Sequence, residues 1–186
     1  MEHQDLLDRL ERHDPGTVEH SRRVGDLACS IARGMGLVAL ADDPQFHVAA
    51  TFHDVGKLLI PRLLLRRPGP LDAAEWELMR MHTVFGAGIL AQDGALAEAC
   101  SYVVAHHERI DGAGYPYGLA GEEIPLGARL ISVADAFEAM TSGRPYQPAL
   151  SEIETMTRLR LGSGTQFDLQ VVTAALDILP ARVAAA

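Results

Sequence analysis

The sequence has little of what marks secreted, membrane-spanning or disulfide-bonded proteins. It contains only two cysteines among 186 residues, Cys29 and Cys100, which form no CxxC pair. We therefore expect two reduced thiols in an apolar core. No apolar run approaches the roughly 18 residues that a membrane-spanning helix requires, and the polar, acidic N-terminus is unlike a signal peptide. These absences predict a cytoplasmic protein without a membrane span.

Basic charge is also scarce. Lysine and arginine total 16 against 25 aspartates and glutamates, which gives a formal net charge of −9. This balance argues against a nucleic acid polymer as partner, because such binding depends on basic surface that neutralises phosphates. A small phosphate-bearing substrate is not excluded, since a metal site supplies local positive charge. Aromatic residues make up only 5% of the chain, so the core is expected to be aliphatic.

The chain length predicts a single domain with a substantial core. Apolar residues recur at helical spacing nearly throughout, so the predicted fold class is all-α, a bundle of about seven helices. Two long segments, 56–71 and 108–124, interrupt the pattern and are expected to be functional loops. We divide the chain into an N-terminal helical extension at 1–13, a main domain at 14–180 and an Ala-rich tail at 181–186.

Local signals mark where several of these helices begin. Asp72 with Glu75, and Ser151 with Glu154, have the spacing of a capping box. Asp168 is placed to cap the last helix. Asp72 begins a helix at about 72–89, and the other expected helices cover about 4–13, 17–35, 44–55, 96–107 and 126–141. The last of these is apolar on all sides, which is typical of a central helix.

What the sequence does contain in quantity is histidine, with eight residues. Three of them, His3, His13 and His47, belong to no pattern. The other five lie in or at the ends of predicted helices among apolar neighbours, and two aspartates share this setting. The resulting set is His20, His53, Asp54, His82, His106, His107 and Asp135.

Each of these residues has an ordinary structural explanation when it is taken alone. The adjacent pair at 53–54 is explained by a His–Asp hydrogen bond in the core. In the doublet at 106–107, one histidine would face inward and the other outward. Asp135 would be explained by an arginine partner, such as Arg129 or Arg144.

Taken together, the seven residues favour a metal centre. Buried histidine and aspartate are costly unless they are paired or bound to a metal, and a helix-bundle core is a common place for metal sites. Seven nitrogen and oxygen ligands suit two borderline ions, such as iron or manganese, better than one structural zinc. The lack of a thiolate in the set also argues against structural zinc.

Several sequence blocks resemble the HD-GYP family. Residues 53–57 (HDVGK) resemble the HDxGK signature of HD-domain phosphohydrolases. Residues 106–116 (HHERIDGAGYP) resemble the extended signature that gives HD-GYP proteins their name. The blocks at 14–24, 118–126, 133–137 and 141–146 also fit the family, and the whole match runs from about 14 to 172.

The resemblance implies an HD-fold helical bundle that holds two divalent metal ions, iron or manganese. By motif, the ligands would be His20, His53, Asp54, His82, His106, His107 and Asp135. Asp54 would bridge the metals and Lys57 would contact the scissile phosphate, so these two are the expected catalytic residues. Some family members carry a glutamate four residues before the first ligand histidine and bind three metals. Gly16 occupies that position here, so a two-metal site is expected, and Glu19 should point away from it.

The resemblance also implies substrate-binding residues. Gly114, Tyr115 and Pro116 would border the substrate pocket, and Arg144 would hold a substrate phosphate. Gln147 follows the Arg-Pro-Tyr motif at a position where family members often carry lysine or arginine. It keeps a hydrogen-bond donor there and lacks the charge.

The expected function is that of a phosphodiesterase that opens a cyclic dinucleotide, with cyclic di-GMP as the expected substrate. A hydroxide that bridges the metals would attack phosphorus and give the linear dinucleotide, and a second cleavage would give GMP. Arg62, Arg66 and Arg67 would either steer phosphate to the site or form a solvated surface cluster. Two alternatives remain open. One is another HD-domain nucleotide phosphohydrolase, and the other is a non-catalytic module that binds a cyclic dinucleotide, a diguanylate cyclase or another regulatory partner.

Overall fold

The protein is built from α-helices, as predicted. The computed structural model describes residues 3–142 and 149–183, and in these ranges it contains no β-strand. Two isolated bridges, Asp111 with Ala120 and Ser163 with Phe167, are the only β-type pairings found there. No helix in the described ranges is long and apolar enough to cross a membrane.

The described residues form more helices than the seven or so expected. The α-helices are α1 (His3–His13), α2 (Thr17–Gly34), α3 (Val38–Ala41), α4 (Pro44–Phe52), α5 (Arg62–Leu65), α6 (Ala73–Arg80), α7 (His82–Leu90), α8 (Ala97–Ala105), α9 (Leu126–Ser142), α10 (Glu152–Gly162) and α11 (Leu169–Val183). Three short 3-10 helices are η1 (Val55–Leu59), η2 (Gly94–Leu96) and η3 (Gly121–Glu123). The excess arises because α3 and α5 are about one turn long and because one expected helix is divided.

This division separates α6 from α7 at Met81. The two residues that follow turn their side chains back onto the end of α6. His82 Nδ1 lies 2.7 Å from the carbonyl oxygen of Met79, and the Thr83 hydroxyl donates to the carbonyl of Arg80 at 3.1 Å. Side chains that bond to nearby carbonyls compete with the helical ladder. The apolar periodicity runs across this point, so the pattern alone predicts one continuous helix.

The predicted capping residues begin their helices. The Asp72 carboxylate accepts a hydrogen bond from the amide of Glu75, and the Glu75 carboxylate accepts one from the amide of Asp72, both at 2.9 Å. The Ser151 hydroxyl accepts from the amide of Glu154 at 3.2 Å. Asp168 accepts from two amides in the first turn of α11. These bonds satisfy donors that have no partner within the helix.

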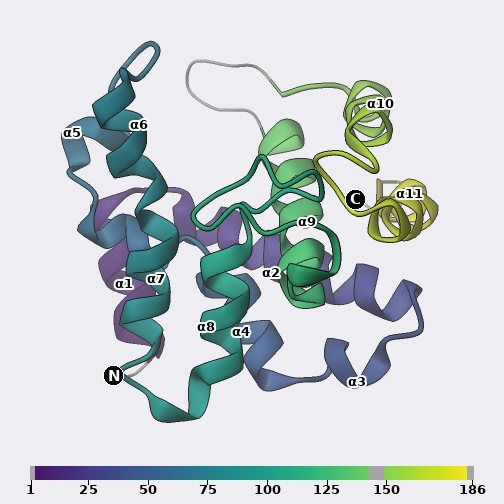
Figure 1. Ribbon diagram of the computed structural model, residues 1–186, viewed down its shortest axis with the longest axis horizontal. Helices are drawn as coiled ribbons and strands as arrows, with labels where there is room; N and C mark the ends of the chain where they lie inside the picture. The colour runs from purple at the N-terminus through teal and green to yellow at the C-terminus, as the bar shows by residue number, and fades with distance from the viewer. Residues whose placement is uncertain (1–2, 143–148, 184–186) are drawn as a thin grey trace.

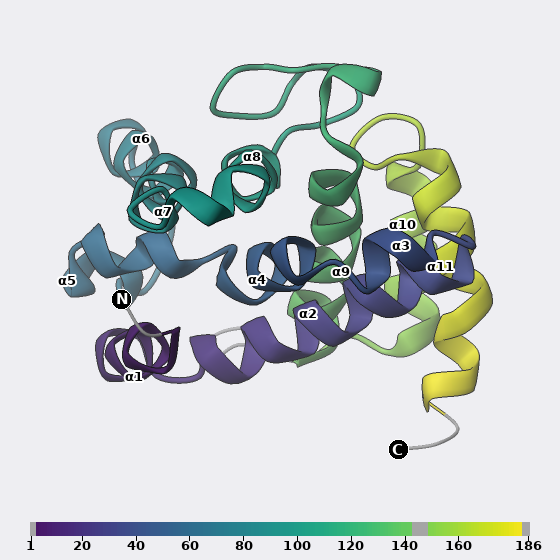
Figure 2. The same ribbon diagram turned by 90° about the horizontal axis from the view of Figure 1, so that it is seen from below.

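Helix α9 is central, as its all-round apolar character predicts. It lies between α8 on one side and α10 and α11 on the other (Figures 1 and 2). In the view of Figure 2, α4 lies between α2 and α8, and the loop between α8 and α9 projects from the side of the bundle remote from α2. The core is aliphatic, with Ile31, Leu130 and Leu159 fully buried. Cys29 and Cys100 are free thiols.

Close backbone contact fixes η1 against α7. A Cβ atom on Gly56 would lie 1.9 Å from the carbonyl oxygen of His82 and 2.5 Å from the amide nitrogen of Gly86. Only a residue without a side chain allows this approach. Because Gly56 follows Asp54 by two residues, the contact holds Asp54 beside the first residue of α7.

Replacing Gly56 with alanine should therefore destabilise the protein. The added Cβ meets backbone atoms that cannot rotate away, so we expect the free energy of unfolding to fall by at least about 2 kcal/mol. Gly88→Ala is the matched control, because its Cβ would meet nothing within 4 Å and alanine favours the helix by about 0.5–1 kcal/mol. Urea unfolding measures both. Equal stability of the two variants would show that the approach of η1 is not tight.

Candidate metal centre

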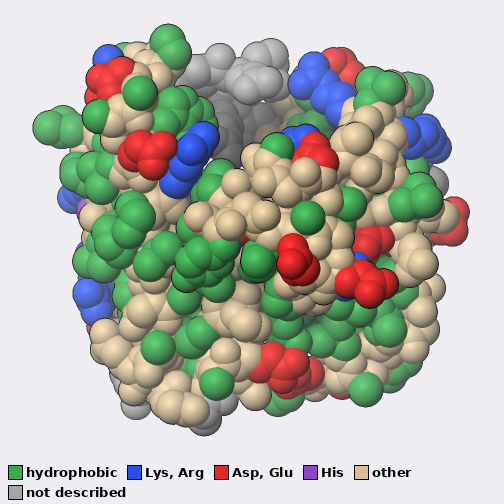
Figure 3. Space-filling view, in the orientation of Figure 1, with side chains coloured by type: hydrophobic (Ala, Val, Ile, Leu, Met, Phe, Trp, Pro, Cys, Tyr) green, Lys and Arg blue, Asp and Glu red, His purple; other side chains and the backbone are tan. Residues whose placement is uncertain are grey.

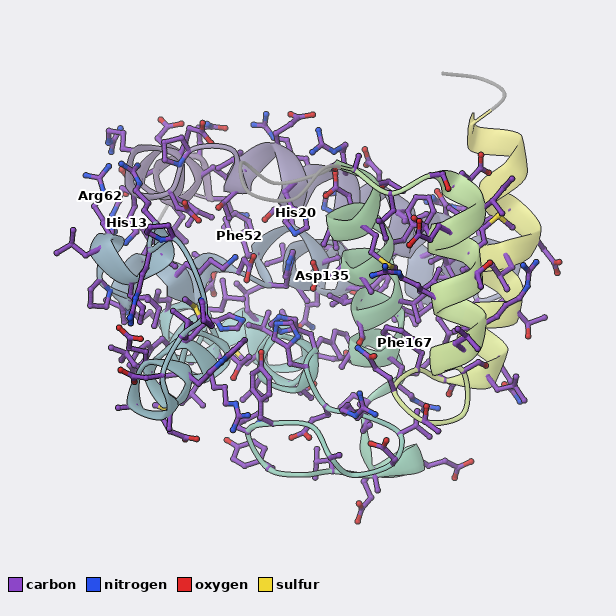
Figure 4. All side chains as sticks on the ribbon, turned by 90° about the horizontal axis from the view of Figure 1, so that it is seen from above. His13, His20, Phe52, Arg62, Asp135 and Phe167 are labelled. Atoms are coloured by element: carbon purple, nitrogen blue, oxygen red, sulfur yellow. The ribbon has the colours of Figure 1, made fainter. Side chains whose placement is uncertain are left out.

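The seven residues that the sequence singled out come together at the centre of the bundle. His20 lies in the first turn of α2, and His53 and Asp54 lie at the end of α4. The others are His82 at the start of α7, His106 and His107 at the end of α8, and Asp135 in α9. Figure 4 shows His20 and Asp135 pointing toward each other across the space between α2 and α9.

The residues form three groups of potential ligands. His20, His53 and Asp135 make the first triad, and His82, His106 and His107 make the second. The third group, His53, Asp54 and His106, shares one histidine with each triad. Within each triad, one nitrogen or oxygen atom per residue lies within 4.8 Å of the others. His20 Nε2 is 3.1 Å from Asp135 Oδ1, which closes the first triad.

Asp54 lies between the two triads with one oxygen toward each. Its Oδ2 is 3.6 Å from His53 Nε2, and its Oδ1 is 3.5 Å from His82 Nε2. A carboxylate in this orientation can contribute a ligand to each of two ions. Lys57 Nζ is 2.6 Å from Asp54 Oδ2, and the lysine side chain is 20% exposed.

Three of the histidines are held in the same way. The Nδ1 atoms of His53, His82 and His106 lie 2.6–2.9 Å from the carbonyl oxygen of the residue three positions earlier. A carbonyl only accepts, so Nδ1 carries the proton and Nε2 presents a lone pair. Among the described residues, these three Nε2 atoms are buried and have no hydrogen-bond partner. Buried polar atoms without a partner are costly, and a metal ion is the partner that this donor set fits.

The protonation states also suit metal binding. Burial lowers the pKa of His106 well below its usual range and that of His107 to about 3, so both are neutral at pH 7. Burial alone would raise the pKa of Asp54, but the Lys57 ammonium group and nearby imidazoles hold it well below its usual value. Neutral imidazoles and ionised carboxylates are the forms that bind metals.

Glu138 is a buried carboxylate at the site that the sequence analysis missed. It accepts hydrogen bonds from His20 Nδ1, Arg23 Nε and the Ser142 hydroxyl. His20 therefore contacts a carboxylate through each ring nitrogen, because Asp135 faces its Nε2. Burial opposes a charge on His20, but these two carboxylates raise its pKa to about 9. A metal ion that binds at Nε2 must displace a proton there. Metal binding at His20 should therefore depend more strongly on pH than metal binding at His106 or His107.

A signal for Glu138 was present in the sequence. It follows Asp135 by three residues, and residues at this spacing share one face of a helix. Glu19 differs from it in spite of its proximity to His20 in the chain. It lies on the exposed side of α2, where it pairs with Arg23 at 3.1 Å, and it points away from the site as expected.

The arginine explanation for Asp135 is wrong for Arg129. That side chain pairs with Asp168 at 2.7 Å instead. The other proposed partner, Arg144, lies outside the described residues, and so does Gln147. Asp135 contacts His20 and lies 3.9 Å from His53.

The arginines after Lys57 are only partly free to steer phosphate. Arg62 donates to the carbonyls of Arg12 and His13 at the end of α1. Arg67 forms an ion pair with Glu75. For Arg62 and Arg67, these contacts support a surface cluster and not the steering of phosphate.

The glycine-rich loop between α8 and α9 is tied to the site. Glu108 is buried, and its carboxylate accepts from the amides of Tyr117 at 2.7 Å and Leu119 at 3.1 Å. The amide of Tyr115 donates to the carbonyl of His107 at 3.2 Å, and the two rings are 5.0 Å apart. A Cβ on Gly114 would lie 2.4 Å from the amide nitrogen of Arg109, so glycine is required there.

This loop borders a pocket of about 470 Å³ next to the second triad. Its lining residues include Trp76 and Arg80 of α6, His107 at the end of α8, Gly114 and Tyr115 of the loop, and Ser132 of α9. Pro116 follows Tyr115 through a cis peptide bond and is not among the described lining residues. Trp76 and Arg80 are pocket residues that the sequence analysis did not identify.

Glu138 is expected to position His20 for metal binding, and its loss should weaken that binding. A partner that orients a ligand histidine contributes about 10- to 100-fold to metal affinity, so Glu138→Ala should lose manganese affinity by that factor in calorimetric titration. Glu138→Gln keeps an acceptor for Nδ1 and should retain most of the affinity. Glu19→Ala is the matched control, because Glu19 shares Arg23 with Glu138 and does not contact His20. Equal affinities of Glu138→Ala and Glu19→Ala would exclude the positioning role.

Comparison with known proteins identifies the family of this fold and site. A family model described as an HD domain matches residues 6–171. A cyclic di-GMP phosphodiesterase of Thermotoga maritima is 39% identical over 178 residues, which are 94% of this chain and 48% of the relative. A cyclic di-GMP phosphodiesterase response regulator of Xanthomonas campestris is 37% identical, over 92% of this chain and 46% of the relative. A 3'3'-cGAMP-specific phosphodiesterase of Vibrio cholerae is 34% identical, over 92% of this chain and 38% of the relative.

The chain thus spans about half or less of the length of these curated relatives.

Solved structures show the same fold. The HD-GYP-type protein Bd1817 of Bdellovibrio bacteriovorus superposes with a TM-score of 0.70 at 22% identity, over 88% of this chain and 52% of that one. The HD domain of the phosphodiesterase PgpH of L. monocytogenes, in complex with cyclic-di-AMP, superposes with a TM-score of 0.67 at 20% identity, over 96% of this chain and 95% of that one. The predicted HD-fold bundle is therefore confirmed, and this chain belongs to the HD-domain family and, within it, to the HD-GYP group.

Proposed function

We propose that this chain is the catalytic part of a metal-dependent phosphodiesterase that hydrolyses a cyclic dinucleotide, with cyclic di-GMP as substrate. The observation that carries the proposal is the placement of Asp54, with one carboxylate oxygen toward each of two ligand triads. Relatives named as cyclic di-GMP phosphodiesterases carry the same domain over more than nine-tenths of this chain. The products are the linear dinucleotide and, after a second cleavage, GMP.

The residues fit two divalent ions, one for each triad, with Asp54 as the shared ligand. The ligand set contains imidazole and carboxylate groups without a thiolate, which favours iron or manganese. Bound ions of this kind stabilise charge on the phosphate and lower the pKa of water. Their four positive charges exceed the charges of Asp54 and Asp135, so the site attracts an anionic diester although the chain is acidic overall.

Lys57 is proposed to contact the scissile phosphate. Burial opposes its charge, but the neighbouring Asp54 raises its pKa, so the ammonium group is charged at pH 7. It lies next to the proposed shared ligand, where a phosphate oxygen would bind. Gly114 and Tyr115 border the pocket next to the second triad, and Pro116 follows them in the same loop. Arg144 and Gln147 are proposed as further substrate contacts.

The location of the protein, the extent of its catalytic unit and the source of its control are also proposed. The chain is proposed to act in the cytoplasm, where its two free thiols would stay reduced. Residues 14–180 are proposed as the catalytic unit, after a helical extension and before an Ala-rich tail. Control is proposed to come from a partner protein, such as a diguanylate cyclase, or from a further regulatory part.

Substitution of the proposed shared ligand and of Lys57 should have different effects. Asp54→Asn should lose metal and lower turnover of cyclic di-GMP by more than about 100-fold, whereas Lys57→Ala should keep both ions and lose a similar factor in kcat. Asp26→Asn, on the exposed side of α2, is the matched control. Metal content and linear product are measured on the same samples, with 3'3'-cGAMP as a second substrate.

Full metal occupancy of the wild-type protein without turnover of any cyclic dinucleotide would contradict the enzymatic proposal. It would favour the alternative of a binding module. Turnover of other nucleotides alone would favour a different HD-domain phosphohydrolase.

A further inference from the structure

The α6 wall of the pocket carries two side chains to which the proposed mechanism assigns no role. Trp76 and Arg80 are four residues apart, so they share one face of α6, and both line the pocket with His107 and Tyr115. Trp76 is the only tryptophan of the chain, and it is 47% exposed. A large ring at the mouth of a pocket offers a flat apolar surface for a ligand.

Of the two arginines that line the pocket, Arg80 has the weaker ion pair. Its pair with Glu77 has a separation of 3.2 Å, and the two side chains are 46% and 75% exposed. Exposed pairs of this kind are weak and give way to a better partner. By contrast, Arg109, the other arginine that lines the pocket, donates two hydrogen bonds to Asp111, at 2.9 and 2.6 Å.

Tyr115 connects Arg80 with the metal centre. The guanidinium carbon of Arg80 lies 5.4 Å from the centre of the Tyr115 ring, a favourable cation–π arrangement that orients the guanidinium. The same ring is 5.0 Å from the ring of His107 and 6.5 Å from that of His82. The α6 wall is therefore next to the second triad. Figure 3 shows hydrophobic side chains gathered over the α6–α8 side of the molecule, with basic and acidic side chains beside them.

We propose that Arg80 binds the phosphate that is not being cleaved and that Trp76 stacks on a purine base of the cyclic dinucleotide. This inference rests on the proposed function. When one phosphate of a cyclic dinucleotide lies at the metal centre, its second phosphate and its bases must lie against neighbouring surface. The pocket adjoins that centre, and its volume of about 470 Å³ is in the range of small-ligand sites. A planar guanidinium suits phosphate, and exposed aromatic rings stack on bases.

Fluorescence gives a direct binding test, because emission at position 76 is the only tryptophan signal of the chain. A hydrolysis-resistant phosphorothioate analogue of cyclic di-GMP should quench it saturably in the manganese-loaded protein, and inorganic phosphate should not. Arg80→Ala should raise the dissociation constant about 10- to 100-fold. Arg158→Ala is the matched control, because Arg158 also pairs with a glutamate on an exposed helix face. Binding of the analogue without quenching would overturn the stacking role.

Kinetics separate this subsite from the metal centre. Arg80→Ala and Trp76→Leu should lower kcat/KM for cyclic di-GMP about 10- to 100-fold, and should leave hydrolysis of methyl p-nitrophenyl phosphate unchanged. That diester has one phosphate and no base. Arg80→Lys should restore part of the loss and Trp76→Phe most of it.

The outcomes that contradict the inference differ from those that contradict the proposed function. Unchanged kcat/KM for cyclic di-GMP in both variants would overturn the inference alone. Equal losses on both diesters would also overturn it, since they would indicate damage to the metal centre. Failure of the wild-type protein to bind or hydrolyse any cyclic dinucleotide would overturn the proposed function, and the inference with it.

Discussion

The site depends on one repeated interaction, the bond between a histidine Nδ1 and a carbonyl at the end of a helix. Helices α4, α6 and α8 end close together, and the carbonyls of Ala50, Met79 and Val103 in their last turns face His53, His82 and His106. The last carbonyls of a helix have no partner within it. Each imidazole satisfies one of them and is thereby turned so that Nε2 points to the common centre. The same bonds that end the helices thus orient the potential metal ligands.

The surrounding structure holds these helix ends in fixed positions relative to one another. Gly56 lets the backbone after Asp54 approach α7 to a distance that any side chain would prevent, and this approach puts the carboxylate between the triads. On the far side, Glu108 binds two amides of the glycine-rich loop and holds Tyr115 beside His107. The result is a cluster of ionised carboxylates and imidazoles inside an apolar bundle, in which His106 and His107 are neutral and His20 holds a proton between two carboxylates. Such a cluster is costly without ions and well matched to them, which links the stability of the core to its chemistry.

Much of this arrangement could be predicted from the sequence, and the omissions have physical reasons. Capping at Asp72 and Asp168 depends on neighbouring residues, so local pattern was sufficient. Histidines and aspartates in apolar stretches need partners, which predicted the set of seven. The division at Met81 was missed because His82 and Thr83 act through their side chains while the apolar periodicity continues. Trp76 and Arg80 were missed because exposed residues at helical spacing are usual, and a role for them is indicated only by the loop that lines the same pocket. Glu138 was missed although its spacing from Asp135 was a usable signal.

The central claim is that the two triads hold two metal ions that share Asp54, and anomalous diffraction from a manganese-loaded crystal tests it most directly. The account predicts two anomalous peaks about 3.5–4 Å apart. One peak should lie among His20, His53 and Asp135, the other among His82, His106 and His107, with Asp54 in contact with both. A single peak at full manganese loading, or two peaks with Asp54 bound to neither, would contradict the account.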